Sequence, residues 1–315
     1  MREENETTDA SVLILGYRTV CTYGPLNGKS LDQKPRSIQW DLQFITFVTS
    51  MVFQLATLIL SAISLSKSGN PNPAPPLLTV VVTLELIVQV VELLWYGIVG
   101  SLYYFGMLSI GVRYRYYDWV VTTPVGLIGL IIFIWFLECQ SATTDILSDG
   151  SRITAIVVIV IFDWLMLFVG YVYEAELDLR NTLNELVSCV PFGQPRNSDR
   201  YSIYQVRGLF LGWIPFVGIF IPMFVALAAA SQSDSIAWGW FTIVFTFVTW
   251  ALYGVVAIYW RRPEDAPMKN TCYNLLDIVS KNIVGLVTSI IAFNLSTSEQ
   301  SQSWQDVTCG VNTSN

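Results

Sequence analysis

The sequence predicts an all-α fold, a bundle of seven transmembrane helices, and three observations support that prediction. Of the 315 residues, 53% are hydrophobic and only 13% are charged, whereas a soluble domain carries about 25% charged residues. The mean hydropathy is +0.51. Seven apolar segments are separated by connectors rich in glycine, proline, serine and aspartate, such as SKSGNPNPAPP and RRPEDAPMKN. A bilayer therefore suits this chain as a solvent better than water does.

The seven apolar segments are each long enough to cross about 30 Å of hydrocarbon at about 1.5 Å per residue. Because backbone polar groups in lipid must be satisfied within the helices, one helical bundle accounts for all of them. We expect the spans at roughly 40–66, 76–100, 113–138, 152–174, 205–231, 235–260 and 271–295. A polar segment (1–39) precedes this transmembrane domain (40–295), and a tail rich in serine and threonine (296–315) follows it. In the longest connector, NTLNELV is compatible with a short surface helix.

The charged and metal-binding residues exclude several classes of function. A net charge of −7 argues against a nucleic-acid partner, because phosphate binding needs a basic surface. The chain has no histidine, which disfavours hydrolase triads and most zinc sites, so we expect neither an enzyme nor a metal centre. The five cysteines have no metal-binding spacing. Cys21 and Cys189 lie in hydrophilic segments, where a disulfide and free thiols are equally compatible with the sequence.

Lys281 is the most informative ionisable residue inside a predicted span. It lies near the middle of the last span, and a buried ammonium needs a charged partner. Asp277 is four residues earlier on the same helical face, and Asp118 of the third span is a second candidate partner. A lysine in an apolar pocket is also suited to forming a Schiff base with a carbonyl compound. These residues alone support a structural ion pair and a Schiff-base lysine about equally.

Two motifs distinguish between these interpretations. The third span contains RYRYYDWVVTTP, an Arg-x-x-Asp-Trp-x-x-Thr-Thr-Pro pattern that runs from Arg115 to Pro124. The last span contains Asp-x-x-x-Lys, formed by Asp277 and Lys281. Together these motifs resemble the microbial (type 1) rhodopsins, and the resemblance extends over all seven spans. It implies the seven-helix bundle of that family.

The resemblance also implies a cofactor and its binding site. Lys281 would hold all-trans retinal as a protonated Schiff base, with Asp118 and Asp277 as counterions and Arg115 stabilising the two carboxylates. The implied retinal pocket further comprises Trp119, Thr122, Thr123, Asp163, Met166, Gly170, Trp213, Trp250 and Tyr253. Gly254 stands where many pumps of the family have proline, and Ala257 stands where a second tryptophan is usual. Both departures predict a looser pocket.

Polar side chains follow one face of several spans, which in a lipid-embedded helix indicates an interior face. Two glutamates seven residues apart on the second span resemble those of channelrhodopsins, and the wider pattern most resembles the viral channelrhodopsin group. In that family the pore lies between the first, second, third and seventh helices. The implied ion pathway comprises Ser50, Gln54, Glu85, Gln89, Glu92, Asn270, Asn274 and Asn282.

The sequence therefore predicts a light-gated ion channel for cations such as H⁺, Na⁺ and K⁺, because carboxylates in a pore attract cations. A light-driven outward proton pump is the alternative: Asp118 would accept the proton, but Gly129 stands at the usual donor position. An anion channel and a sensory rhodopsin remain further alternatives.

The resemblance also implies a multi-pass protein of the plasma membrane, in contact with the lipid bilayer. It further implies an N-terminus outside, a cytoplasmic tail, and assembly as a dimer or trimer. The lysines and arginines of the connectors favour the opposite orientation, but they are few, and we follow the motifs.

Overall fold

The computed structural model of the protein describes residues 42–68, 76–104, 112–139, 149–188, 203–229, 236–260 and 265–297. The polar segment 1–39, Cys21, Cys189 and nearly all of the tail lie outside these residues. The helices are α1 (Leu42–Ser68), α2 (Pro76–Tyr104), α3 (Arg113–Cys139), α4 (Gly150–Ser188), α5 (Ile203–Ala229), α6 (Ile236–Tyr259), α7 (Ala266–Asp277) and α8 (Ile283–Thr297). A π-helical turn, η3 (Ile278–Asn282), joins α7 to α8. The described residues contain no strand, so the predicted all-α class is confirmed.

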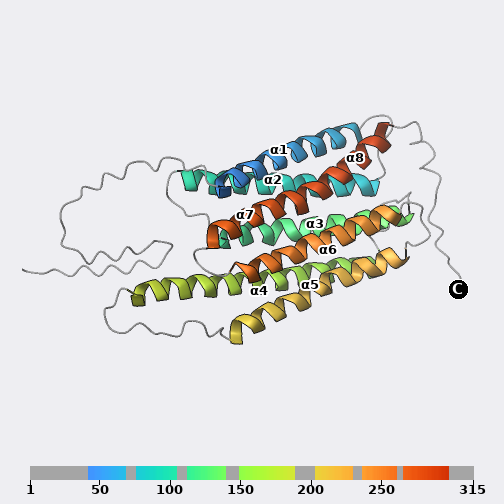
Figure 1. Ribbon diagram of the computed structural model, residues 1–315. Helices are drawn as coiled ribbons and strands as arrows, with labels where there is room; N and C mark the ends of the chain where they lie inside the picture. Colours follow the sequence, from blue (N-terminus) through green and yellow to red (C-terminus); the bar gives the residue numbers. More distant parts are fainter. Residues whose placement is uncertain are drawn as a thin grey trace, which may run out of the picture.

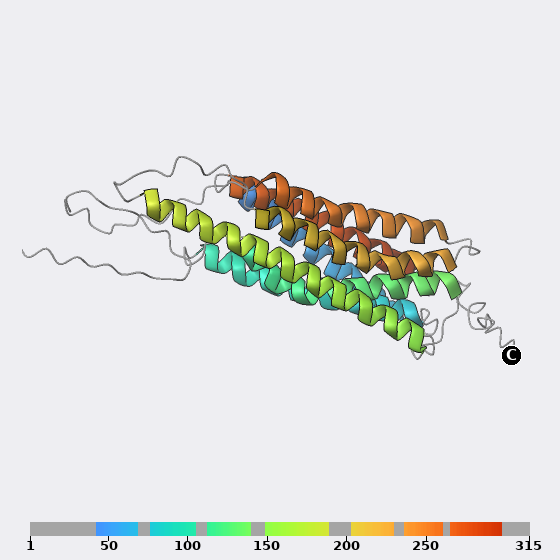
Figure 2. The same ribbon diagram turned by 90° about the horizontal axis from the view of Figure 1, so that it is seen from below.

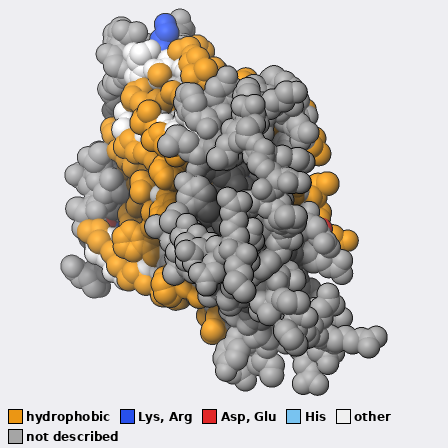
Figure 3. Space-filling view, turned by 90° about the vertical axis from the view of Figure 1, so that its left-hand side faces the viewer, with side chains coloured by type: hydrophobic (Ala, Val, Ile, Leu, Met, Phe, Trp, Pro, Cys, Tyr) orange, Lys and Arg blue, Asp and Glu red, His pale blue; other side chains and the backbone are white. Residues whose placement is uncertain are grey.

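The helices run side by side along one bundle (Figures 1 and 2). Because α7, η3 and α8 follow one another as a single rod, the described residues contain seven spans that are long and apolar enough to cross a membrane. Hydrophobic side chains cover the flanks of the bundle where described residues are visible (Figure 3). Their exposure is expected where lipid rather than water is the solvent. The predicted seven-span architecture is confirmed.

Two helix boundaries differ from the prediction. α4 continues to Ser188, so NTLNELV extends this helix and is not a separate surface helix. α7 begins at Ala266 rather than near residue 271, with Pro267 in its first turn, where a missing N–H costs little. Hydropathy placed the start later because Lys269 and Asn270 are polar. Both side chains are buried inside the bundle, so they are not exposed to lipid.

The apolar core lies mainly around α3, α5 and α6. α3 is the central helix: 72% of its most apolar stretch is buried, against 17% for α4, which faces lipid along most of its length. Ile131 and Phe133 of α3 pack in one cluster with Phe220 and Met223 of α5, all of them fully buried. This core holds α3 in place, and α3 in turn presents its polar residues to α2 and α7.

Candidate functional site

Lys281 lies within the π-helical turn η3, where it faces carboxylates from three helices. Its Nζ is paired with Glu92 of α2 and lies 3.6 Å from Asp118 Oδ1 on α3 and 4.0 Å from Asp277 Oδ1 on α7. The lysine side chain is 10% exposed, and the three acidic side chains are 1% exposed or less. The structure thus brings together the predicted lysine and both predicted counterions. Sequence reasoning missed that Glu92, expected only in the ion pathway, is also paired with the lysine.

Asp277 is held by three side chains besides the lysine. Its Oδ2 accepts a hydrogen bond from Tyr96 at 2.5 Å and is paired with Arg115, and its Oδ1 accepts one from Tyr253 at 2.7 Å. Arg115 also donates to Asn274 and, at 2.9 Å, to the Tyr96 hydroxyl. A carboxylate with this many donors is fixed in position. Arg115 is therefore paired with Asp277, which is one of the two carboxylates that it was expected to stabilise.

Asp118 is less constrained than Asp277. Thr122 donates to its Oδ1 at 3.3 Å, while its Oδ2 has no hydrogen-bond partner among the described residues. Around the lysine, the carboxyl groups of Glu92, Asp118 and Asp277 face two cations, Lys281 and Arg115. This buried cluster, which we call the lysine cluster, therefore has a formal excess of one negative charge.

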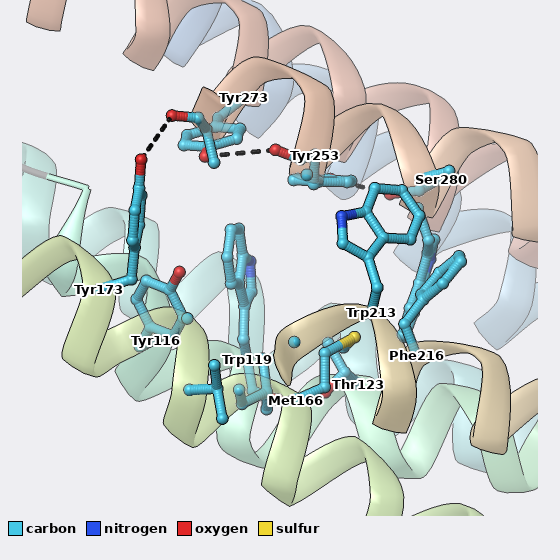
Figure 4. Close-up of a pocket in the computed structure, with 18 of the residues that line it drawn as sticks. Tyr116, Trp119, Thr123, Met166, Tyr173, Trp213, Phe216, Tyr253, Tyr273 and Ser280 are labelled. Atoms are coloured by element: carbon cyan, nitrogen blue, oxygen red, sulfur yellow. Dashed lines mark hydrogen bonds between the residues drawn. The ribbon is translucent and has the colours of Figure 1, made fainter. Parts of the chain in front are cut away.

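An apolar cavity lies next to the lysine cluster, between α3, α4, α5, α6 and the α7–η3 segment, with Lys281 in its wall. Figure 4 shows aromatic side chains pointing into it from several helices, among them Trp119, Trp213 and Tyr253. The predicted pocket residues that line it are Trp119, Thr123, Met166, Gly170, Trp213, Trp250 and Tyr253. Thr122 and Asp163 do not line it. Asp163 lies behind Thr123, which donates to its Oδ2 at 2.8 Å.

Two glycines in the cavity wall are sites of close packing. A Cβ at Gly170 would lie 2.8 Å from the Tyr116 hydroxyl, and one at Gly254 would lie 3.1 Å from the Trp213 indole. The Trp213 ring therefore lies close to Gly254, and the looser pocket expected from Gly254 and Ala257 stays a prediction. A mostly apolar cavity with a single amine, that of Lys281, among its lining residues suits an apolar aldehyde. Retinal is such a molecule.

Several cavity residues were missed by sequence reasoning, including Tyr116, Tyr173, Phe216, Tyr273 and Ser280. Helical spacing offered a signal for two of them. Tyr116 lies three residues before Trp119 on one face of α3, and Tyr273 lies four residues before Asp277 on one face of α7. The other three have no signal that separates them from lipid-facing aromatic or small polar residues.

All eight residues of the predicted ion pathway are buried, on faces of α1, α2 and the α7–η3–α8 rod. Gln54 donates to Glu92 Oε2 at 3.2 Å, and Gln89 donates to Glu85 Oε1 at 2.8 Å. Ser50 lies 3.5 Å from the Gln54 amide. The structure therefore brings together the polar residues of the first and second spans.

The seventh span completes this polar interior. Asn274 donates to Thr46 Oγ1 of α1 at 2.9 Å, and toward the other end of the bundle Ser61 of α1 and Ser289 of α8 are 2.9 Å apart. Asn282 is 3% exposed, and its amide has no partner among the described residues. We call these buried side chains the polar seam: Thr46, Ser50, Gln54, Ser61, Glu85, Gln89, Glu92, Asn270, Asn274, Asn282 and Ser289.

The chain is thus a seven-helix membrane protein in which a lysine with acidic side chains around it lies in the wall of an apolar cavity, where it could bind a carbonyl ligand as a Schiff base. The family described as bacteriorhodopsin-like protein matches residues 41–295. The chain belongs to this family of microbial rhodopsins. It is accordingly an integral multi-pass membrane protein, and membership implies a retinal chromophore. The family consists mainly of photoreceptors and transporters rather than enzymes.

Solved structures support the same fold. The viral rhodopsin OLPVRII is 21% identical, with a TM-score of 0.58 over 81% of this chain and 99% of that chain. The rhodopsin of Exiguobacterium sibiricum is 17% identical, with a TM-score of 0.58 over 81% of this chain and 97% of that one. Xanthorhodopsin, a light-driven ion pump with dual chromophore, is 16% identical, with a TM-score of 0.58 over 81% and 93%. No curated protein sequence matches significantly.

Proposed function

We propose that this protein is a light-gated ion channel that binds all-trans retinal at Lys281 and conducts cations. One observation carries the proposal: the polar seam runs between α1, α2 and the α7–η3–α8 rod and meets the lysine cluster at Glu92. Buried polar groups are costly in a membrane protein and usually mark a substrate or ion path. Here they are in contact with Lys281, the residue that would carry the light-absorbing chromophore.

The cavity residues support the binding of retinal. Trp119, Trp213 and Trp250 would pack against its polyene, and Lys281 would attach it covalently. Bound retinal would supply the absorption of visible light and an isomerisation. The chain's own residues would exclude water from the cavity and hold the positive charge at Lys281 Nζ between Glu92, Asp118 and Asp277.

Gating would begin with a proton moving from Lys281 Nζ to Asp118 or Asp277. Both acceptors lie within 4.0 Å of the nitrogen. Loss of that charge would leave Glu92 without its ionic partner, so Glu92 and its hydrogen bond from Gln54 would rearrange. A local charge change that biases two arrangements of a contact is what a molecular switch requires. Water and ions would then enter between α1, α2 and the α7–η3–α8 rod.

The negative charge along the proposed ion path favours the conduction of cations over anions. The lysine cluster has three carboxyl groups for two cations. Glu85 adds another carboxyl on α2, where it lies against Gly285 of α8. A path lined by carboxylates attracts cations and repels anions. An anion channel is therefore less well supported.

A light-driven outward proton pump is the second candidate, and the 3.6 Å separation between Lys281 Nζ and Asp118 Oδ1 favours it. Gly129 weakens the case for a pump, because it stands at the usual position of the proton donor and a glycine has no side chain that could return a proton to Lys281. Beyond Gly129, α3 buries a run of apolar side chains from Leu130 to Leu137. A sensory role would need a partner protein that responds to a conformational change in the helix bundle.

Whole-cell voltage clamp with retinal and light separates these functions. A photocurrent that reverses sign, with a reversal potential that follows the gradients of sodium, potassium or protons, is the expected result. A current that stays outward at every voltage would instead establish a pump. A coloured protein without current would favour a sensor.

We further propose that the N-terminus lies outside the cell, the tail 296–315 lies in the cytoplasm, and the chain forms a dimer or trimer in the plasma membrane. Protease treatment of intact cells that express an N-terminally tagged protein tests the orientation. Removal of the tag is expected, and full protection would reverse the assignment. Cross-linking in native membranes tests the oligomer.

A further inference from the structure

A buried ion pair joins two helices that belong to different sides of the bundle. Lys269 Nζ, in the first turn of α7, lies 2.5 Å from Glu174 Oε1 on α4. Both residues are only 4% exposed. α4 packs against α3 and α5, whereas α7 packs against α1 and α6, so this ion pair crosses the interior at the end where α4 leaves the bundle and α7 begins (Figure 1).

The ion pair is continuous with one wall of the cofactor cavity. Tyr173 directly precedes Glu174, and Tyr273 lies one turn after Lys269 on the same face of α7. Both tyrosines line the cavity, and Figure 4 shows them together with Tyr116 on one side of it. A change in the ion pair would therefore shift the side chains that line the cavity.

The same two tyrosines connect the ion pair to α6. The Tyr173 hydroxyl donates to the carbonyl of Ala257, and the Tyr273 hydroxyl donates to the carbonyl of Tyr253, both at 3.5 Å. Both acceptors belong to α6. These long hydrogen bonds depend on the present spacing of α4, α6 and α7. The charge-assisted ion pair between Lys269 and Glu174 is one of the contacts that hold this spacing.

We propose that Lys269 and Glu174 are positioning residues whose ion pair holds α4 to α7 in the dark, fixes the tyrosine wall of the cavity, and sets the rate of return to the dark state. Separating the two charges inside the bundle would break a close, charge-assisted contact in a buried environment, which is costly. The ion pair therefore opposes movements that separate α4 from α7, and it favours the return of the protein to the dark state. The inference rests on the proposed retinal binding but not on ion conduction.

Flash photolysis of the purified, retinal-bound protein tests the inference, with the absorption maximum and the rate of dark-state recovery as readouts. Lys269→Met combined with Glu174→Gln removes both charges without leaving one unpaired. We expect a shifted absorption maximum and a recovery at least about threefold slower. The matched control is Arg152→Gln with Glu138→Gln, which removes the partly exposed 3.4 Å pair at the other end of the bundle. Its recovery should stay within about twofold of the wild type.

A second variant keeps the test decisive if the neutral double variant does not fold. Lys269→Arg keeps the charge, and a guanidinium can make two hydrogen bonds to one carboxylate, so recovery should become faster. Unchanged spectrum and recovery in the variant that folds would overturn the inference. A wild-type protein that stays colourless with retinal would overturn both the inference and the proposed function. Colour without photocurrent would contradict the channel alone.

Discussion

The two sides of the bundle differ in what their helices bury. Between α3, α4, α5 and α6 the interior is mostly aromatic and aliphatic, as with Phe133, Phe216 and Phe220. Between α1, α2 and the α7–η3–α8 rod it consists largely of the hydroxyl, amide and carboxyl groups of the polar seam. In lipid, an apolar interior holds helices together by close packing, whereas a polar one must repay its desolvation by hydrogen bonding. This difference fits the proposed function, in which the apolar side would hold the cofactor and the polar side would change its state.

The lysine cluster lies at the boundary between the two sides, and it should show the largest effect. Lys281→Ala removes the amine from the cavity wall, so no retinal can be attached. We expect a protein that still reaches the membrane but has no visible absorption and no photocurrent. Absorption spectroscopy after incubation with retinal checks this. Retained colour would show that Lys281 is not the attachment site.

A substitution on the polar side should alter ion flow. Glu92→Gln removes the carboxylate that is paired with Lys281 and accepts from Gln54, so we expect a changed ratio of cation permeabilities or loss of current. Reversal potentials under exchanged external cations provide the measurement. Glu138→Gln, outside the polar seam, serves as the control. Permeability ratios identical to those of the wild type would exclude Glu92 from the ion path.

A substitution on the apolar side should instead affect stability. Phe220→Ala removes a ring that is 1% exposed, in contact with Phe216 and Trp250, and should destabilise the bundle by about 3 kcal/mol. Thermal bleaching of the retinal-bound protein would then occur at lower temperature, while the reversal potential stays unchanged. An altered selectivity would mean that the two sides are not separate in function.

The smallest effect is expected where α4 begins, outside the membrane. Ser151 donates two hydrogen bonds to Asp149, from its hydroxyl and its backbone N–H, and they lower the pKa of this exposed carboxyl. A carboxyl with a lowered pKa in the folded state contributes stability above its unfolded pKa and loses it as the pH falls through the folded one. Asp149→Asn should slightly reduce the acid dependence of thermal bleaching. An unchanged profile would remove Asp149 from the acid response.

Much of this arrangement could be predicted from the sequence because a membrane restricts the chain to few possible structures. Seven apolar segments must become helices in lipid. The motifs around Asp118 and Lys281 predict where the cofactor would bind. The face of α2 that carries Glu85 and Glu92 could also be predicted from helical spacing. These predictions need only local periodicity and the chemistry of the side chains.

The tertiary structure decided the contacts that depend on how helices are placed relative to one another. Spacing along α2 could not show that Glu92 reaches the level of Lys281, because the rotation and height of one helix against another are set by packing over the whole bundle. The π-helical turn η3, the Trp213 ring beside Gly254 and the Lys269–Glu174 ion pair have the same origin. The sequence by itself determined seven spans and the lysine at which we propose that retinal binds. Packing determined which carboxylates surround that lysine and which distant charges meet.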